Sequence, residues 1–219
     1  FLDKVPVEYV ENAFGWLKSQ GYERIGVDGM SKGREMALVA ASMFSELSCV
    51  IVRVPSHFVS EGLKGHKKDK GPSGTSCWSY KGKELPYAPY KARTFNILKM
   101  FMEEKEMHII TFNRDKDISP ESMIAIENIK APILMLSSKN DTVWPSYESS
   151  LYMEKKFTEI NYLYPHKHVA YENMSHALLT ELPFIYKLAF KCERNNAKGC
   201  QKDREMMKKE LLDWVNEVW

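Results

Sequence analysis

Residues 24–44 read RIGVDGMSKGREMALVAASMF, and this stretch decides the fold. Its first part, residues 25–28, carries β-branched side chains and predicts a short strand. The join that follows, residues 29–33, has the pattern G-x-S-x-G and predicts a tight turn from strand to helix. From residue 36 onward the spacing of apolar residues predicts one buried helix face. The residues of that face are Met36, Ala40, Met43 and Phe44.

The turn suits a nucleophile for steric and electrostatic reasons. Ser31, at its apex, is expected to have a strained backbone, and larger residues at Gly29 or Gly33 are expected to clash with the adjoining elements. The turn also aims the first helical amides at the serine, so the backbone N–H of Lys32 is the expected oxyanion donor. The plainer alternative is that Ser31 is only a turn serine, because the motif is short.

Composition narrows the class of protein. The 219 residues are enough for one sizeable core, so one domain over residues 1–219 is expected. Lys and Arg together number 31 against 29 Asp and Glu, a balance that calls for neither nucleic acid nor a membrane as partner. The first residues, FLDKVPVEYV, lack the basic start and apolar middle of a signal peptide. A cytoplasmic protein is therefore expected.

The four cysteines do not form a disulfide framework. Cys49 lies in an expected core strand and Cys77 in an expected polar loop, while Cys192 and Cys200 fall in a charged loop where they could pair. Free thiols are the favoured interpretation. The spacing suits no metal site, and neither a metal nor a cofactor is expected.

The order of predicted elements is that of an α/β protein. Residues 7–20 predict an amphipathic helix, and two continuous apolar runs, residues 48–54 and 132–138, predict strands buried on both faces of a parallel sheet. A helix over residues 147–157 and a weaker strand at 169–171 follow. The chain ends in a predicted helix over residues 203–218, whose apolar stripe is Met207, Leu211, Trp214 and Val218.

A long polar excursion separates the two apolar strands. Residues 56–93 are rich in Gly, Lys, Ser and Pro and show little periodicity, and residues 64–70 predict a solvated charge cluster. Helices are expected near residues 95–102 and 119–129. Residues 56–130 together are expected to form a loop and a small cap over the site.

A serine nucleophile needs a base, and the base needs a carboxylate to orient it. The candidates in the chain order Ser, acid, His are Ser31, Asp141 and His176, with Asp141 directly after the run at 132–138. His57 is the best rival histidine near the pocket, whereas His66 and His168 look solvated. The remaining rivals are His108, His166, Asp115, Asp117 and Glu172.

Several segments carry a family resemblance: VEYVENAFGWLKS, GMSKG, SYKGKELP, MIAIENIKAPILML and NDTVW, together with the surroundings of His176. The chain resembles the C-terminal catalytic domain of the acyl-CoA thioesterase / bile acid-CoA:amino acid N-acyltransferase family. The resemblance implies an α/β-hydrolase fold with a mostly parallel sheet flanked by helices, and a triad of Ser31, Asp141 and His176. Because the acyltransferase branch uses cysteine as nucleophile, the serine here favours thioester hydrolysis, with an acyl-CoA as substrate.

Two departures from that family stand out. Ser175 stands where the family commonly has glycine, and only 24 residues, encoding one helix, precede Ile25. The strands that normally come before the nucleophile strand are expected to be missing, together with the loop that supplies a second oxyanion donor. The strand at 25–28 would then be an open sheet edge, through which copies could associate. A carboxylesterase or peptidase-type hydrolase and a non-catalytic partner-binding module remain alternatives.

Overall fold

The computed structural model describes residues 2–66, 69–90 and 118–219. Its centre is a four-stranded sheet in which all neighbouring strands are parallel. The strands, in order across the sheet, are β2 (Gly26–Met30), β3 (Cys49–Arg53), β8 (Ile133–Ser138) and β9 (His166–Tyr171). The α/β class is therefore confirmed, and among the described residues β2 lies at one edge of this sheet, paired only with β3.

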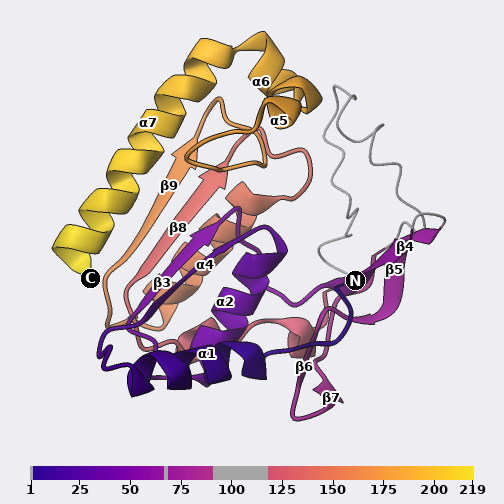
Figure 1. The fold of residues 1–219 in the computed structure, drawn as a ribbon, viewed down its shortest axis with the longest axis vertical. Helices are drawn as coiled ribbons and strands as arrows, with labels where there is room; N and C mark the ends of the chain where they lie inside the picture. The colour runs from indigo at the N-terminus through magenta and orange to yellow at the C-terminus, as the bar shows by residue number, and fades with distance from the viewer. Residues whose placement is uncertain (1, 67–68, 91–117) are drawn as a thin grey trace.

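Alternate side chains of β3 and β8 serve two separate cores. Val50, Val52, Ile133 and Met135 belong to the cluster that holds α2 (Lys32–Met43), α1 (Glu8–Ser19) and α4 (Ser146–Glu159). The intervening residues Cys49, Ile51, Leu134 and Leu136 pack against α7 (Ala197–Asp213) and the π-helical turn η3 (Trp214–Val218). Figure 1 shows α7 on one side of the sheet and α2 on the other. This two-sided burial explains the continuous apolar runs of β3 and β8.

The predicted apolar faces of two helices need correction. On α2 the buried apolar residues are Ala37, Leu38, Val39, Ala40 and Ala41. Of the expected face only Ala40 is fully buried, while Met43 is 40% exposed. The small alanines, rather than the methionines, face the sheet because they let helix and strands approach closely.

On the C-terminal stripe, Met207 and Trp214 are buried but Val218 is exposed. The chain turns π-helical at Trp214, and the wider turn carries Val218 away from the stripe that a 3.6-residue period predicts. Two short helices that the sequence pattern did not predict precede α7. They are α5 (Phe184–Ala189) and α6 (Lys191–Asn195).

The excursion, predicted as a long loop with little periodicity, contains strands that the sequence pattern did not predict. β4 (Glu61–His66) and β5 (Asp69–Ser76) form an antiparallel hairpin. β6 (Trp78–Tyr80) pairs with β1 (Val5–Pro6) in parallel and with β7 (Lys83–Glu84) antiparallel. Cys77, expected in a polar loop, is completely buried between β5 and β6, and burial raises the pKa of its thiol to about 12. All four cysteines are free thiols.

The helix expected over residues 119–129 is also wrong. Two short 3-10 turns, η1 (Pro120–Ser122) and η2 (Ile126–Asn128), are separated by extended backbone at Met123. Ile124, Ile126 and Ile129 are all buried, so this segment packs on more than one side and cannot be an amphipathic helix. Lys64 of the predicted charge cluster is exposed. Residues 91–117, with the helix expected near 95–102 and much of the expected cap, lie outside the described residues.

Within the described ranges no helix is long and apolar enough to cross a membrane. The same residues contain no group of three or more His, Cys, Asp or Glu side chains placed to hold a metal ion.

Candidate active site

The turn between β2 and α2 has the strain that its sequence predicts. Ser31 has φ 53° and ψ −125°, in the left-handed half of the map that residues other than glycine rarely enter. A Cβ at Gly29 would lie 2.4 Å from the carbonyl oxygen of Gly33, so Gly29 is required by close approach. The expected clash at Gly33 is wrong, because a Cβ there would meet nothing within 4 Å. The two glycines of the motif therefore have unequal roles.

Lys32 is the first residue of α2. The first backbone N–H groups of a helix have no intrahelical acceptor, and they carry the positive end of the helix dipole. The expected oxyanion donor is thus the amide next to Ser31 at a helix N-terminus, which is chemically suited to an anion.

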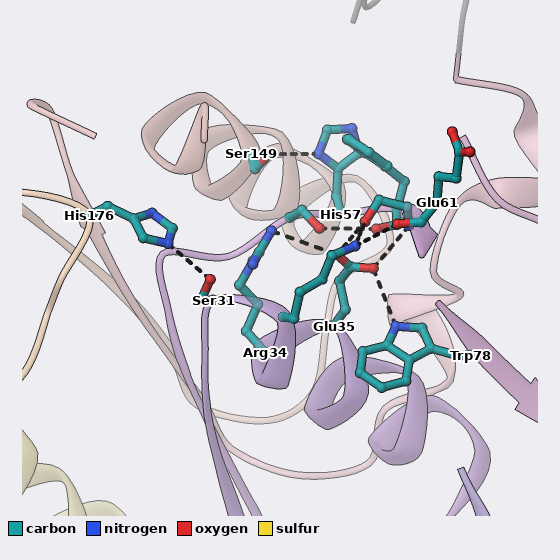
Figure 2. Close-up of polar contacts among 12 residues, drawn as sticks. Ser31, Arg34, Glu35, His57, Glu61, Trp78, Ser149 and His176 are labelled. Carbon is teal, nitrogen blue, oxygen red and sulfur yellow. Dashed lines mark hydrogen bonds and ion pairs between the residues drawn. The ribbon is translucent and has the colours of Figure 1, made fainter. Parts of the chain in front are cut away.

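Ser31, His176 and Asp141 come together although 145 residues of chain separate the first two. His176 Nε2 lies 3.0 Å from Ser31 Oγ, and His176 Nδ1 lies 2.9 Å and 3.0 Å from the two oxygens of Asp141 (Figure 2 shows the His176–Ser31 contact). Because a carboxylate can only accept, Nδ1 carries the proton and Nε2 is left to accept from the serine hydroxyl. His176 is therefore placed to act as a base toward the Ser31 hydroxyl, and the Asp141 carboxylate orients the imidazole from its other nitrogen.

The Asp141 carboxylate is held from three directions. Its Oδ1 accepts from the backbone N–H groups of Val143 and Trp144, at 3.0 Å and 2.9 Å, and its Oδ2 accepts from Ser146 Oγ at 2.8 Å. The side chain is almost fully buried, at 1% exposure. These bonds fix the direction in which the carboxylate faces His176.

A second buried cluster holds the loop that carries His176. Ser175 Oγ donates to Glu193 of α6 at 3.0 Å, and Arg204 of α7 pairs with the same Glu193 oxygen at 2.9 Å. Asp203 accepts from the backbone N–H of Asn173 at 2.7 Å. Ser175, which departs from the family pattern, thus anchors the histidine loop to α6 and α7.

The rival histidines take other places. His57 Nδ1 lies 3.2 Å from Ser149 Oγ, and its ring stacks on Tyr152 with centroids 4.1 Å apart. The expectation that His168 is solvated is wrong, because its side chain is 5% exposed and lies between Ser137 and Glu154, at 2.7 Å and 3.2 Å. Burial lowers the pKa of His168.

The other rivals do not reach Ser31 or His176 through any described contact. His166 is exposed, and Glu172 forms an exposed ion pair with Lys139. The side chain of His66 and the residues His108, Asp115 and Asp117 lie outside the described part of the chain.

A buried ionic cluster beside the turn was not predicted. The Glu35 carboxylate accepts from the backbone N–H and the hydroxyl of Ser60, at 2.9 Å and 2.6 Å, and lies 3.2 Å from Lys32 Nζ (Figure 2). Burial alone would raise the pKa of Glu35, but Lys32 and then Arg34 outweigh it and the pKa is lowered. Burial likewise opposes the charge of Lys32, but Glu35 holds its pKa above the ordinary value. The sequence feature that could have indicated this cluster is the charged run K-G-R-E at residues 32–35, because it opens a helix that packs against the sheet.

A pocket of about 500 Å³ lies beside α4. Its lining is mostly apolar, and Phe58 in that lining packs against Trp144 with ring centroids 5.6 Å apart. The lining includes His57, Phe58, Ile118, Met123, Leu151 and Tyr152. Trp144 also donates its backbone N–H to Asp141. The pocket is therefore linked to Asp141 through the packing of Phe58 on Trp144.

The family description "BAAT / Acyl-CoA thioester hydrolase C terminal" matches residues 5–192. The chain belongs to this family. The acyl-CoA thioester hydrolase C-terminal family places it among α/β-hydrolases, in agreement with the parallel sheet and the strained serine turn. A comparison with curated proteins finds no significant match.

One solved structure agrees with the fold of this family member. An acylaminoacyl peptidase from Pyrococcus horikoshii superimposes with a TM-score of 0.51 at 12% identity, covering 94% of this chain. The chain spans only 26% of that peptidase. A structure reported for the metagenome-derived lipolytic enzymes LipS and LipT gives a TM-score of 0.38 at 13% identity, covering 93% of this chain and 72% of the other. At these identities the first likeness concerns the fold alone, and the second is too weak to carry an argument.

Proposed function

We propose that the chain is a serine hydrolase that cleaves acyl thioesters, with an acyl-CoA as substrate. The observation that supports this best is the hydrogen-bonded series from Ser31 through His176 to Asp141. Membership in a family described as an acyl-CoA thioester hydrolase supports thioesters as the proposed substrate class. Serine in place of cysteine as nucleophile favours water over an amine as the final acceptor.

In the proposed reaction His176 Nε2 takes the proton of Ser31 as Oγ attacks the thioester carbonyl carbon. The oxyanion that forms is stabilised by the Lys32 backbone N–H. The C–S bond then breaks, and His176 returns the proton to the departing thiolate. In the second half His176 deprotonates a water molecule that attacks the acyl-serine ester, and the proton passes back to Ser31 Oγ as the acid leaves. The apolar pocket beside α4 is the candidate for the acyl chain.

The test combines a mutation with a chemical probe. Ser31→Ala is expected to abolish release of CoA thiol from a panel of acyl-CoAs and to abolish labelling by a fluorophosphonate, which reacts only with an activated serine. Ser42→Ala is the matched control, because Ser42 lies on the same helix and bonds only the carbonyl of Val39 among the described contacts. Thiol release that survives Ser31→Ala would reject the proposal.

The same experiment separates the alternatives. A carboxylesterase or peptidase would turn over p-nitrophenyl esters or peptides well and acyl-CoA poorly, and a non-catalytic module would not be labelled. Association of copies through the β2 edge is a further proposal, since a strand paired on one side offers free backbone groups. Light scattering that finds only a monomer would count against it.

A further inference from the structure

Two cysteines that are eight residues apart in the sequence meet where α6 ends and α7 begins. In one continuous α-helix that separation would place them about 12 Å apart. Instead, Cys200 Sγ lies 3.6 Å from the carbonyl oxygen of Cys192. The backbone of Asn196 between them is not helical, with φ −137° and ψ 54°, and Figure 1 shows α6 meeting the start of α7 there. The break between the two helices therefore brings the two side chains together.

The two thiols also contact each other, and the contact makes them chemically unequal. It lowers the pKa of Cys192 and raises the pKa of Cys200, because the neutral thiol of Cys200 can donate a hydrogen bond to the thiolate of Cys192. The thiolate is the reactive form of cysteine, so Cys192 is the nucleophile of the pair. Cys200 lies beside it as the thiol that can form a disulfide with it.

Cys192 is the cysteine that a small oxidant can reach. It is half-buried, whereas Cys49, Cys77 and Cys200 are each at most 1% exposed. Burial also raises the pKa of Cys49 and of Cys77, which keeps both as unreactive thiols. Access and thiolate character therefore coincide at Cys192.

We propose that Cys192 and Cys200 form a redox site, which hydrogen peroxide converts to an intramolecular disulfide. The Cys192 thiolate attacks one peroxide oxygen, the O–O bond breaks, and the departing hydroxide takes up the proton that Cys192 had released. Cys192 is then a sulfenic acid. The sulfur of Cys200 attacks the sulfenic sulfur, the S–O bond breaks, and the second hydroxide takes up the Cys200 proton. Two electrons pass from the two thiols to one peroxide molecule, which becomes two water molecules.

The pair contacts the loop of His176 on both sides of that residue. When both thiols are protonated, the Cys200 S–H donates to the carbonyl oxygen of Asn173, at 3.0 Å. Cys192 packs against the apolar cluster that contains Ala177. A disulfide has no S–H, so oxidation removes this donor to Asn173 and changes the packing next to Ala177.

Oxidation is therefore expected to lower kcat for thioester hydrolysis about 2- to 10-fold, because His176 loses part of the support that positions it. This consequence rests on the proposed function, whereas the disulfide itself does not. A thiol reductant such as dithiothreitol should restore the original rate.

Peptide mass spectrometry tests the disulfide directly. Reduced, folded protein is treated with hydrogen peroxide, then unfolded, alkylated with iodoacetamide and digested with trypsin. Cleavage after Arg194 and Lys198 separates the two cysteines into the peptides 192–194 and 199–202. These peptides are expected as one linked species, lighter by two hydrogen atoms than their sum, which dithiothreitol separates.

The peptides of Cys49 and Cys77 are the internal control, and both should carry the alkyl label. Recovery of Cys192 and Cys200 as alkylated thiols, or of Cys192 as an unlinked sulfinic acid, would overturn the proposal.

Two variants separate the disulfide from other oxidative damage. Cys192→Ser is expected to hydrolyse acyl-CoA at the rate of the reduced protein and to keep that rate after peroxide treatment, because Cys200 has lost its partner. Cys49→Ala is the matched control, which should still form the link and lose activity. A link that forms without any change in kcat would reject the coupling to His176. A link that forms in a protein that hydrolyses no thioester would support the redox site and reject the hydrolase proposal.

Discussion

The two glycines of the G-x-S-x-G turn should respond in opposite ways to the same methyl group. In Gly29→Ala the new Cβ would lie 2.4 Å, 2.7 Å and 2.8 Å from three backbone atoms of Gly33 and Arg34. Contacts below 3.0 Å are essentially never seen for real Cβ atoms, so the turn must open by about 1 Å to restore ordinary contact. In Gly33→Ala the methyl group meets nothing, and the residue is exposed in the first turn of α2.

The magnitudes follow from these contacts. Overpacking costs about 1–3 kcal/mol, and the upper end applies at Gly29 because backbone atoms cannot rotate away. For a chain of this size about 3 kcal/mol corresponds to a Tm lower by about 6–12 °C. Alanine is favoured over glycine in a helix by about 1 kcal/mol, so Gly33→Ala should be neutral or slightly stabilising.

Urea unfolding followed by circular dichroism measures both variants, and fluorophosphonate labelling reports whether Ser31 keeps its geometry. Gly29→Ala should lose both stability and labelling. The steric reasoning would be refuted if Gly33→Ala lost as much free energy of unfolding as Gly29→Ala, or if Gly29→Ala unfolded at the same urea concentration as the unaltered protein.

Three further outcomes are expected. Asp141→Asn should lower kcat for thioester hydrolysis by about 10⁴-fold with little change in the fold, because His176 loses its carboxylate partner; a loss under tenfold would contradict the role given to Asp141. The lowered pKa of Glu35 means that the unfolded chain binds its proton first, so the stability from the Lys32–Glu35 pair is present above pH 4.5 and is lost as the pH falls below that value; urea titrations should show a weaker acid dependence in Glu35→Gln, and equal slopes would argue against it. Cys77, with its pKa raised to about 12, should resist iodoacetamide at pH 8 until the protein is unfolded, as peptide mass spectrometry would show.

The parts of the fold that could be predicted are those whose burial is determined by a short stretch of the sequence itself. The apolar runs of β3 and β8 and the glycine–serine turn each specify their own environment, and the order of the elements then brings the strand ends together. Ser31, Asp141 and His176 all follow the carboxyl ends of parallel strands, which is why chain order alone could select them.

The parts that could not be predicted depend on partners far away in the sequence. β6 is a strand because it lies beside β1 at the start of the chain, and nothing in its own polar surroundings indicates that pairing. His168 looks solvated among charges until α4 brings Glu154 beside it. The Lys32–Glu35 cluster likewise needs Ser60, which arrives from the excursion. Polar residues reveal their burial only when their partners are known.

The support behind the histidine loop has a practical consequence for choosing domain boundaries. The family match stops at residue 192, and the residues that support the histidine loop lie beyond it. Asp203 accepts a hydrogen bond from Asn173, and Arg204 pairs with Glu193, which in turn accepts from Ser175. A truncation at Cys192 would keep Ser31, Asp141 and His176. It would remove Glu193, Asp203 and Arg204, which hold the histidine loop, and would also remove Met207 and Trp214, which pack against the sheet. Recombinant versions trimmed to the matched segment would therefore give false negatives in an activity screen.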